Sequence, residues 1–247
     1  MEHLDERAYS YAVPTGIAMY NARGAFYPAA LQRMAVGVIE AHLEQIGWDA
    51  PKLVREYGLS WVLLSFSAEI RKPLSPDGVY RAQTWHTHSK GPVFRREFCF
   101  VDQNGEVAVV GATFSSLLDV KKHRLCIDRE ILAQFQKVER ETLLEAEHRY
   151  RLTLPFEPVE TRTVRPSWID GLGHVNNMRY ADLAYDALTA EERAKIDRFT
   201  RMDVWFLREL TADAAFTMEK YGEENAVTLR GVIADDGKPS FVVKLAF

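Results

Sequence analysis

Residues 178–188, MRYADLAYDAL, predict a helix that is apolar on almost every side. Arg179, Asp182 and Asp186 fall at positions i, i+3 and i+7 and form one narrow polar stripe, while apolar or aromatic side chains occupy nearly all the other positions. Such a helix has to be buried on most sides. We therefore expect the strands that follow it to form a sheet that curls around it.

The sequence around this helix supplies those strands. The helix is expected over about 175–188, after a short strand at 159–165. Four further strands are predicted at about 202–210, 214–221, 226–234 and 239–246. Asp235-Asp236-Gly237 separates the last two, where a tight turn is needed.

The N-terminal half has the same order of elements. A helix is expected to begin at Pro28, a residue suited to the first helical position, and to end before Gly47. After a short helix at 51–57, apolar alternation predicts a strand including 64–70 and further strands at 79–88, 93–102 and 106–119. We expect an α+β fold of two tandem units, each a curled antiparallel sheet around a long central helix. The expected division is 1–127, a linker with some helix at 128–158, and 159–247.

Composition excludes several classes of function. The chain has 247 residues, 47% of them hydrophobic, and a net charge of -4, so no global basic field would attract nucleic acid. The first residues lack the pattern of a signal peptide, and no apolar stretch predicts membrane insertion, so we expect a cytoplasmic protein. Cys99 and Cys126 form no Cys-x-x-Cys pair, the histidines show no metal-binding spacing, and no phosphate loop is present. Neither a metal nor a cofactor is expected.

The loop before the 178–188 helix carries the sharpest motif. Residues 170–180, DGLGHVNNMRY, closely resemble the D-x-x-G-H-V-N-N-x-x-Y signature of hotdog-fold thioesterases. Four further stretches resemble the acyl-acyl carrier protein (acyl-ACP) thioesterases of plants and bacteria, in the same order along the chain. They are residues 58–63, Thr84-Trp85, Arg95-Arg96 and residues 205–209. The resemblance implies a double hotdog fold and hydrolysis of fatty acyl-ACP to free fatty acid and ACP thiol.

Thioester hydrolysis needs an activated water and hydrogen-bond donors for the carbonyl oxygen. Matched to the family motif, the catalytic residues are Asp170, His174 and Glu209, with Glu209 the candidate to activate water. The turn at Gly173 is expected to expose backbone N–H groups at a helix N-terminus, where an oxyanion is favoured. The family's Asn falls on Leu172, so Asn176 or a backbone group would have to replace it.

Water is the expected nucleophile, because the cysteine that follows the glutamate in many plant members is Leu210 here. The entrance to the first long helix, residues 21–27, holds neither carboxylate nor histidine, so one catalytic site is expected per chain.

The resemblance also implies how the substrate is held. The N-terminal unit would shape an acyl pocket, with Trp61, Phe66 and Trp85 among its candidate contacts. The partner would be the acidic ACP with its phosphopantetheine-linked acyl chain. Basic clusters that could receive it are Arg71-Lys72, Arg95-Arg96 and residues 121–124. Chain-length preference cannot be predicted, and pairing into a homodimer stays open.

Three alternatives remain. A double-hotdog acyl-CoA thioesterase would keep the chemistry and change the carrier. A non-catalytic acyl-binding hotdog protein would not need Asp170, His174 and Glu209 together. A hotdog dehydratase acting on hydroxyacyl carriers would release water and keep the thioester, but the motif matches the thioesterase pattern better.

Overall fold

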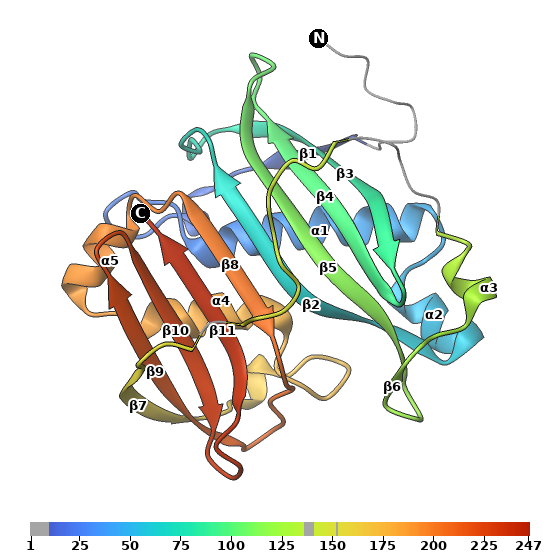
Figure 1. Ribbon diagram of the computed structural model, residues 1–247. Helices are drawn as coiled ribbons and strands as arrows, with labels where there is room; N and C mark the ends of the chain where they lie inside the picture. Colours follow the sequence, from blue (N-terminus) through green and yellow to red (C-terminus); the bar gives the residue numbers. More distant parts are fainter. Residues whose placement is uncertain (1–9, 136–140, 152) are drawn as a thin grey trace.

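The computed structural model describes residues 10–135, 141–151 and 153–247 (Figure 1). Within these residues the strands form one 11-stranded sheet in the order β1-β3-β4-β5-β2-β8-β11-β10-β9-β7, with β6 paired to β5. The strands are β1 Ser10–Pro14, β2 Leu59–Ile70, β3 Val79–Lys90, β4 Val93–Val101, β5 Val107–Asp119, β6 Arg124–Leu125, β7 Glu157–Thr163, β8 Arg201–Phe206, β9 Ala215–Glu223, β10 Ala226–Ile233 and β11 Pro239–Ala246. The helices are η1 Ile17–Met19, α1 Pro28–Gln45, α2 Ala50–Tyr57, α3 Arg129–Leu132, η2 Pro166–Trp168, η3 Asn177–Arg179, α4 Tyr180–Asp186 and α5 Ala190–Ile196.

The predicted fold class is confirmed, with one feature that the sequence did not predict. All pairings are antiparallel, and the strands of each half curl around a helix. The two expected sheets are continuous, however, because β2 pairs with β8 through Ser65↔Trp205 and Ser67↔Asp203. The two halves therefore share one sheet, with α1 and α4 packed against each other on one side of it.

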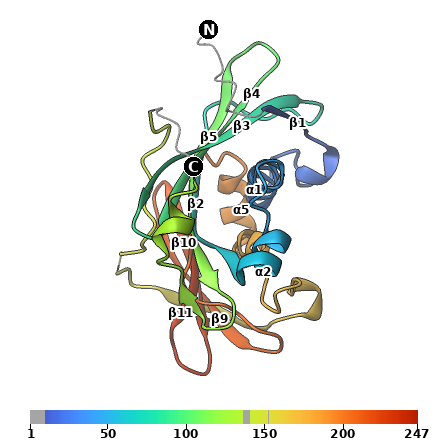
Figure 2. The same cartoon turned by 90° about the vertical axis from the view of Figure 1, so that its right-hand side faces the viewer.

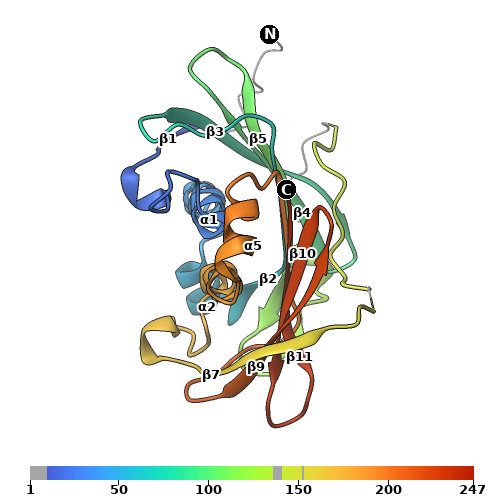
Figure 3. The ribbon, with the colours of Figure 1, turned by 90° about the vertical axis from the view of Figure 1, so that its left-hand side faces the viewer.

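Helix α1 begins where the sequence predicts, with Pro28 at its first position. Its buried face includes Leu31, Met34 and Val38, which join the main hydrophobic core with Phe66 and Phe98 of the sheet. Helices α1, α2 and α5 lie on the same face of the sheet (Figures 2 and 3).

The opposite face of the sheet is covered by residues 141–151, which we call the strap (Figure 3). Leu144 is buried in a cluster that includes Trp85 and Cys99. Trp205 Nε1 donates to the Glu147 carbonyl over 3.0 Å. The strap therefore reaches from the N-terminal strands to β8. The predicted linker helix is limited to α3 among the described residues, and residues 136–140 of that prediction lie outside them.

Two predicted elements are shorter than expected. The helix predicted from 175 begins with η3 at Asn177, because the Asn176 side chain accepts the Met178 N–H and acts as the N-cap. The strand predicted over 202–210 ends at Phe206, so Glu209 lies in the loop after β8 instead of on a strand.

Candidate active site

The motif forms a tight loop between η2 and η3. Ile169 bridges to Val175, the Asp170 N–H donates to the His174 carbonyl over 3.0 Å, and the Gly173 N–H donates to the Asp170 carbonyl over 3.0 Å. Gly173 has a φ of +86°, a left-handed conformation that glycine adopts without steric penalty. The glycine predicted to make a tight turn therefore makes one. Its own N–H is used inside the loop and is not available to an oxyanion.

Hydrogen bonds between this loop and the segment after β8 bring His174 and Glu209 together. The Val175 N–H donates to the Leu210 carbonyl over 2.8 Å, and His174 bridges to Thr211. His174 Nε2 consequently lies 3.1 Å from Glu209 Oε2. Their side chains are 30% and 47% exposed, so the pair is open to water. His174 and Glu209, two of the three predicted catalytic residues, are thus in contact although they lie far apart in the sequence.

Asp170 has a different set of contacts from the one expected. Its Oδ1 accepts the Leu172 N–H over 2.9 Å, which stabilises the turn. Among the described residues it forms no side-chain hydrogen bond with His174. Asp170 also lines two cavities that flank the loop. Leu172, at the position of the family's Asn, is 55% exposed at the tip of the loop.

Asn176, the residue expected to replace that Asn, is the N-cap of η3. Its Oδ1 accepts the Met178 N–H over 2.9 Å, which leaves the two N–H groups of its amide as donors. It lines the same two cavities as Asp170. The next residue, Asn177, opens η3, so its N–H has no partner within the helix. Gln32 Nε2 donates to the Asn177 carbonyl over 3.0 Å and ties α1 to the loop.

Tyr180, the last residue of the motif, is a further polar group behind the loop that the sequence reasoning left without a role. It is 3% exposed, and burial raises the pKa of its hydroxyl to about 12. The phenol therefore stays protonated at neutral pH. The sequence signal that could have identified Tyr180 is its position as the last residue of the D-x-x-G-H-V-N-N-x-x-Y signature.

A cavity of about 810 Å³ extends from the loop between α1 and the N-terminal strands. Apolar side chains form much of its wall, namely Ile39, Leu43, Trp61, Leu63, Phe94 and Phe135. Trp61 is held by a 2.8 Å hydrogen bond from its Nε1 to the Trp48 carbonyl and by edge contacts with Phe94 and Phe135. We call this space the acyl cavity, after the acyl pocket that the resemblance leads us to expect in this half.

Of the three predicted acyl contacts, the structure brings only Trp61 to the acyl cavity. Phe66 is fully buried and stacks on Phe98 in the core. Trp85 lies on the other face of the sheet, where it packs with Cys99 and Leu144 of the strap. Neither lines the cavity.

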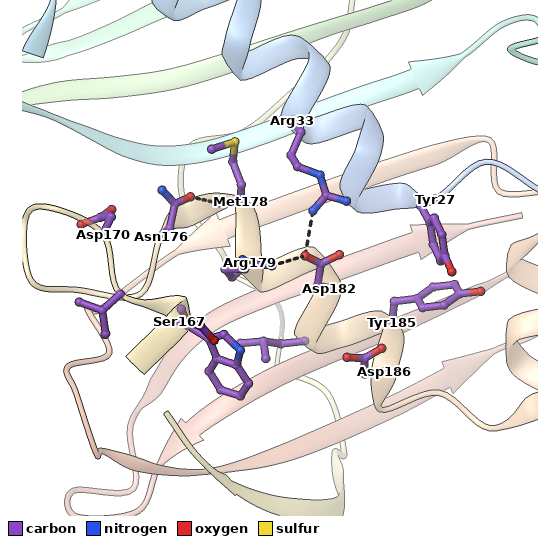
Figure 4. Close-up of a pocket in the computed structure, with 13 residues that line it drawn as sticks. Tyr27, Arg33, Ser167, Asp170, Asn176, Met178, Arg179, Asp182, Tyr185 and Asp186 are labelled. Atoms are coloured by element: carbon purple, nitrogen blue, oxygen red, sulfur yellow. Dashed lines mark hydrogen bonds and ion pairs between the residues drawn. The ribbon is translucent and has the colours of Figure 1, made fainter. Parts of the chain in front are cut away.

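A second cavity, of about 850 Å³, lies on the other side of the loop (Figure 4). Arg33 reaches from α1 to Asp182 of α4, with 2.8 Å between Nη1 and Oδ2, and Arg179 lies 3.7 Å from the same oxygen. Tyr27 and Tyr185 meet edge to face with 5.2 Å between their ring centroids. Because Asp170, Asn176 and Met178 line both cavities, the loop stands between them.

The proposed basic patches differ in accessibility. Arg95 and Arg96 are each only 7% exposed, so they cannot form a docking surface. Lys72 is paired with Asp102 and Glu106. Residues 121–124 remain exposed, although Lys122 pairs with Asp119 over 3.3 Å.

Other kinds of site are not found within the described ranges. No group of three or more His, Cys, Asp or Glu side chains there could hold a metal ion. Both cysteines are buried, and neither lines the two cavities. No helix in the described part of the chain is long and apolar enough to cross a membrane.

Comparisons with known proteins agree with this architecture. An acyl-ACP thioesterase from Bacteroides thetaiotaomicron superposes with a TM-score of 0.85 at 18% identity, covering 98% of each chain. The 12:0-ACP thioesterase from Umbellularia californica gives a TM-score of 0.83 at 12% identity, again covering 98% of each chain. These identities are low enough that the likeness establishes the fold alone, a double hotdog. Among curated proteins, no sequence matches.

The family assignment comes from the N-terminal half. The family model described as the acyl-ACP thioesterase N-terminal domain matches residues 10–135, about half of the chain. This half supplies most of the residues that line the acyl cavity, while Asp170, His174 and Glu209 lie beyond the match. The chain therefore belongs to the acyl-ACP thioesterase family, the thioester hydrolases that release fatty acids from acyl-ACP.

Proposed function

We propose that this chain hydrolyses fatty acyl-ACP with a water molecule activated by Glu209 and His174. The observation that carries the proposal is the 3.1 Å contact between His174 Nε2 and Glu209 Oε2, held on a loop that separates two cavities. A carboxylate and an imidazole at this distance can share the proton of an attacking water.

The reaction would proceed in two steps. In the first, the water oxygen adds to the thioester carbonyl carbon while Glu209 accepts a proton, and the carbonyl oxygen becomes an oxyanion. The Asn176 amide and the Asn177 N–H at the helix entrance are the proposed donors to that oxyanion. In the second step the C–S bond breaks, and the proton returns through the Glu209–His174 pair to the departing sulfur. The products are a carboxylic acid and the ACP thiol.

Asp170 would position this machinery by holding the turn through its bond to the Leu172 N–H. Asp170→Asn keeps an oxygen that can accept this hydrogen bond, whereas Asp170→Ala does not. We expect the asparagine variant to retain more activity if the turn is what matters. A charge requirement would make the two variants equally inactive.

The two cavities would divide the substrate. The acyl chain would enter the acyl cavity, formed mainly by residues of the 1–127 unit, and the phosphopantetheine arm would lie in the cavity beside Arg33. The thioester would then be at Asp170 and Asn176, which line both. On this division the 159–247 unit supplies the reacting groups.

The test is thiol release from acyl-ACP by the wild type and by Asp170→Ala, His174→Ala and Glu209→Ala, each first shown to be folded. General acid–base groups contribute on the order of a hundredfold or more in rate. Losses of that size in the His174 and Glu209 variants support the proposal. A wild type that binds acyl-ACP and releases no thiol would replace it with the acyl-binding alternative.

A further inference from the structure

A buried guanidinium lines the acyl cavity, and no carboxylate of the described residues is paired with it. Arg96 is 7% exposed and lines the cavity from β4. Its Nη1 donates to Nδ1 of His42 over 2.7 Å. Among the described residues no carboxylate lies within ion-pair distance of it. The neighbouring Arg95, on the other face of the sheet, is paired with Glu97 instead.

The His42 partner does not compensate the charge. Burial and the nearby Arg96 lower the pKa of His42 to about 4, so its imidazole is neutral at neutral pH. A neutral ring nitrogen can accept one hydrogen bond but cannot balance a cation. Because an unbalanced buried charge is costly, the remaining N–H groups of Arg96 favour an acceptor placed in the cavity.

Arg96 belongs to a small polar patch in the wall of the acyl cavity. His86 of β3 and Thr113 of β5 lie directly opposite it on the neighbouring strands, and all three line the cavity. We call these three residues the polar patch. Four carboxylate residues also line the cavity. Glu40 and Glu44 are exposed to solvent, Asp49 caps α2 through the Lys52 N–H, and Asp170 lies on the loop, where it accepts the Leu172 N–H.

Helix α1 gives the separation between the polar patch and the catalytic loop. Gln32 of α1 contacts the Asn177 carbonyl, and His42 of the same helix contacts Arg96. Ten residues of helix correspond to about 15 Å along its axis. An acyl chain of medium length that starts at the loop would therefore place its far end near the polar patch.

We propose that the acyl cavity selects acyl chains that carry an acceptor oxygen near their far end, with a carboxylate as the best complement to Arg96. The inference rests on the proposed function, because it takes the thioester to lie at Asp170 and Asn176. An unsubstituted methyl terminus would leave the N–H groups of Arg96 without an acceptor, whereas a carboxylate would accept from them directly.

The test compares hydrolysis of dodecanoyl, ω-hydroxydodecanoyl and ω-carboxy thioesters of equal length on the same carrier, with the octanoyl to hexadecanoyl series beside them. The wild type should prefer the carboxylated chain over the methyl-terminated one in kcat/KM by on the order of tenfold to a hundredfold. Arg96→Met should remove this preference, and Arg96→Lys should restore part of it. Arg95→Lys is the matched control on the opposite face and should leave the ratio unchanged.

A binding measurement separates this inference from the proposed function. Calorimetry with pantetheine amides of the same chains, which cannot be hydrolysed, should show the same order of affinities and the same loss in Arg96→Met. Equal handling of all chain ends by the wild type overturns the inference. The inference is also overturned if the only effect of Arg96→Met is that longer methyl-terminated chains are hydrolysed. Arg96 would then limit the length of the acyl chain and would not recognise its end. Failure of the wild type to cleave any thioester would reject the proposed function, while the calorimetry would still decide the inference.

Discussion

The strap depends on a buried ion pair whose removal has a predictable effect on stability. Arg95 Nε lies 2.5 Å from Glu97 Oε1, and the two side chains are 8% and 0% exposed. Glu97 Oε2 also accepts the Leu143 N–H over 3.2 Å, and Arg95 Nη2 donates to the Leu144 carbonyl over 2.5 Å. The pair therefore joins β4 to the strap.

Glu97→Leu leaves the Arg95 charge buried without its partner, which typically costs about 3–5 kcal/mol. For a chain of this size each kcal/mol lowers Tm by roughly 2–4 °C, so we expect Tm to fall by about 6–20 °C. Arg95→Met should act similarly. The double variant should lose less than the sum of the two single variants, because neither charge is then left buried alone.

Urea unfolding of the wild type, both single variants and the double variant provides the complete cycle. Limited proteolysis should also cut the strap faster in Glu97→Leu than in the wild type. Additive losses, or a fall in Tm within the error of the measurement for Glu97→Leu, would refute the assignment of the pair as the anchor of the strap.

Three further predictions follow from individual residues. Gly173→Ala adds a Cβ at a residue whose backbone is left-handed, although no other atom lies near that Cβ. We therefore expect the unfolding free energy to fall by about 1–2 kcal/mol and kcat to fall as well. In the control, Gly171→Ala, the added Cβ also has open space and the backbone is not left-handed, so both quantities should change less. Because His42 has a folded pKa of about 4 against 6.5 in its ordinary state, the unfolded chain binds more protons between these values. Stability should consequently fall as pH drops from 6.5 towards 4, and the Tm of His42→Gln should fall less over that range. Arg33→Ala should raise KM for acyl-ACP but not KM for the same acyl group on N-acetylcysteamine, which lacks the phosphate. Equal changes in KM for both substrates would show that Arg33 does not bind the phosphopantetheine arm.

Local patterns predicted the helices and most strands because each depends on nearby residues. Pro28 marks the start of α1, and alternation marks β2. The pairing of β2 with β8 is different, since it joins segments far apart in the chain and leaves no periodic signal. The position of the strap could not be predicted for a related reason. Its charged sequence shows no apolar period, and its structure depends on contacts with side chains such as Trp85.

The acyl contacts were hard to predict because residues 82–87 of β3 and nearly the whole of β4 are buried on both faces. Apolar alternation identifies the core face of a strand only when the other face meets water. Alternation along these strands therefore could not place Trp85 on the strap side or Arg96 on the cavity side. The catalytic loop was more predictable, since Gly173 and Asn176 act through local turn and cap geometry.

A single turnover of acyl-ACP in water enriched in heavy oxygen, followed by mass spectrometry of both products and enzyme, shows whether water attacks the thioester directly. Direct attack by a water held between Glu209 and His174 predicts label in the released fatty acid and none in the Glu209 side chain. Glu209→Gln should release neither acid nor thiol at a comparable rate. Label in Glu209, or an acyl group attached to it, would contradict the account, because Glu209 would then be the nucleophile itself.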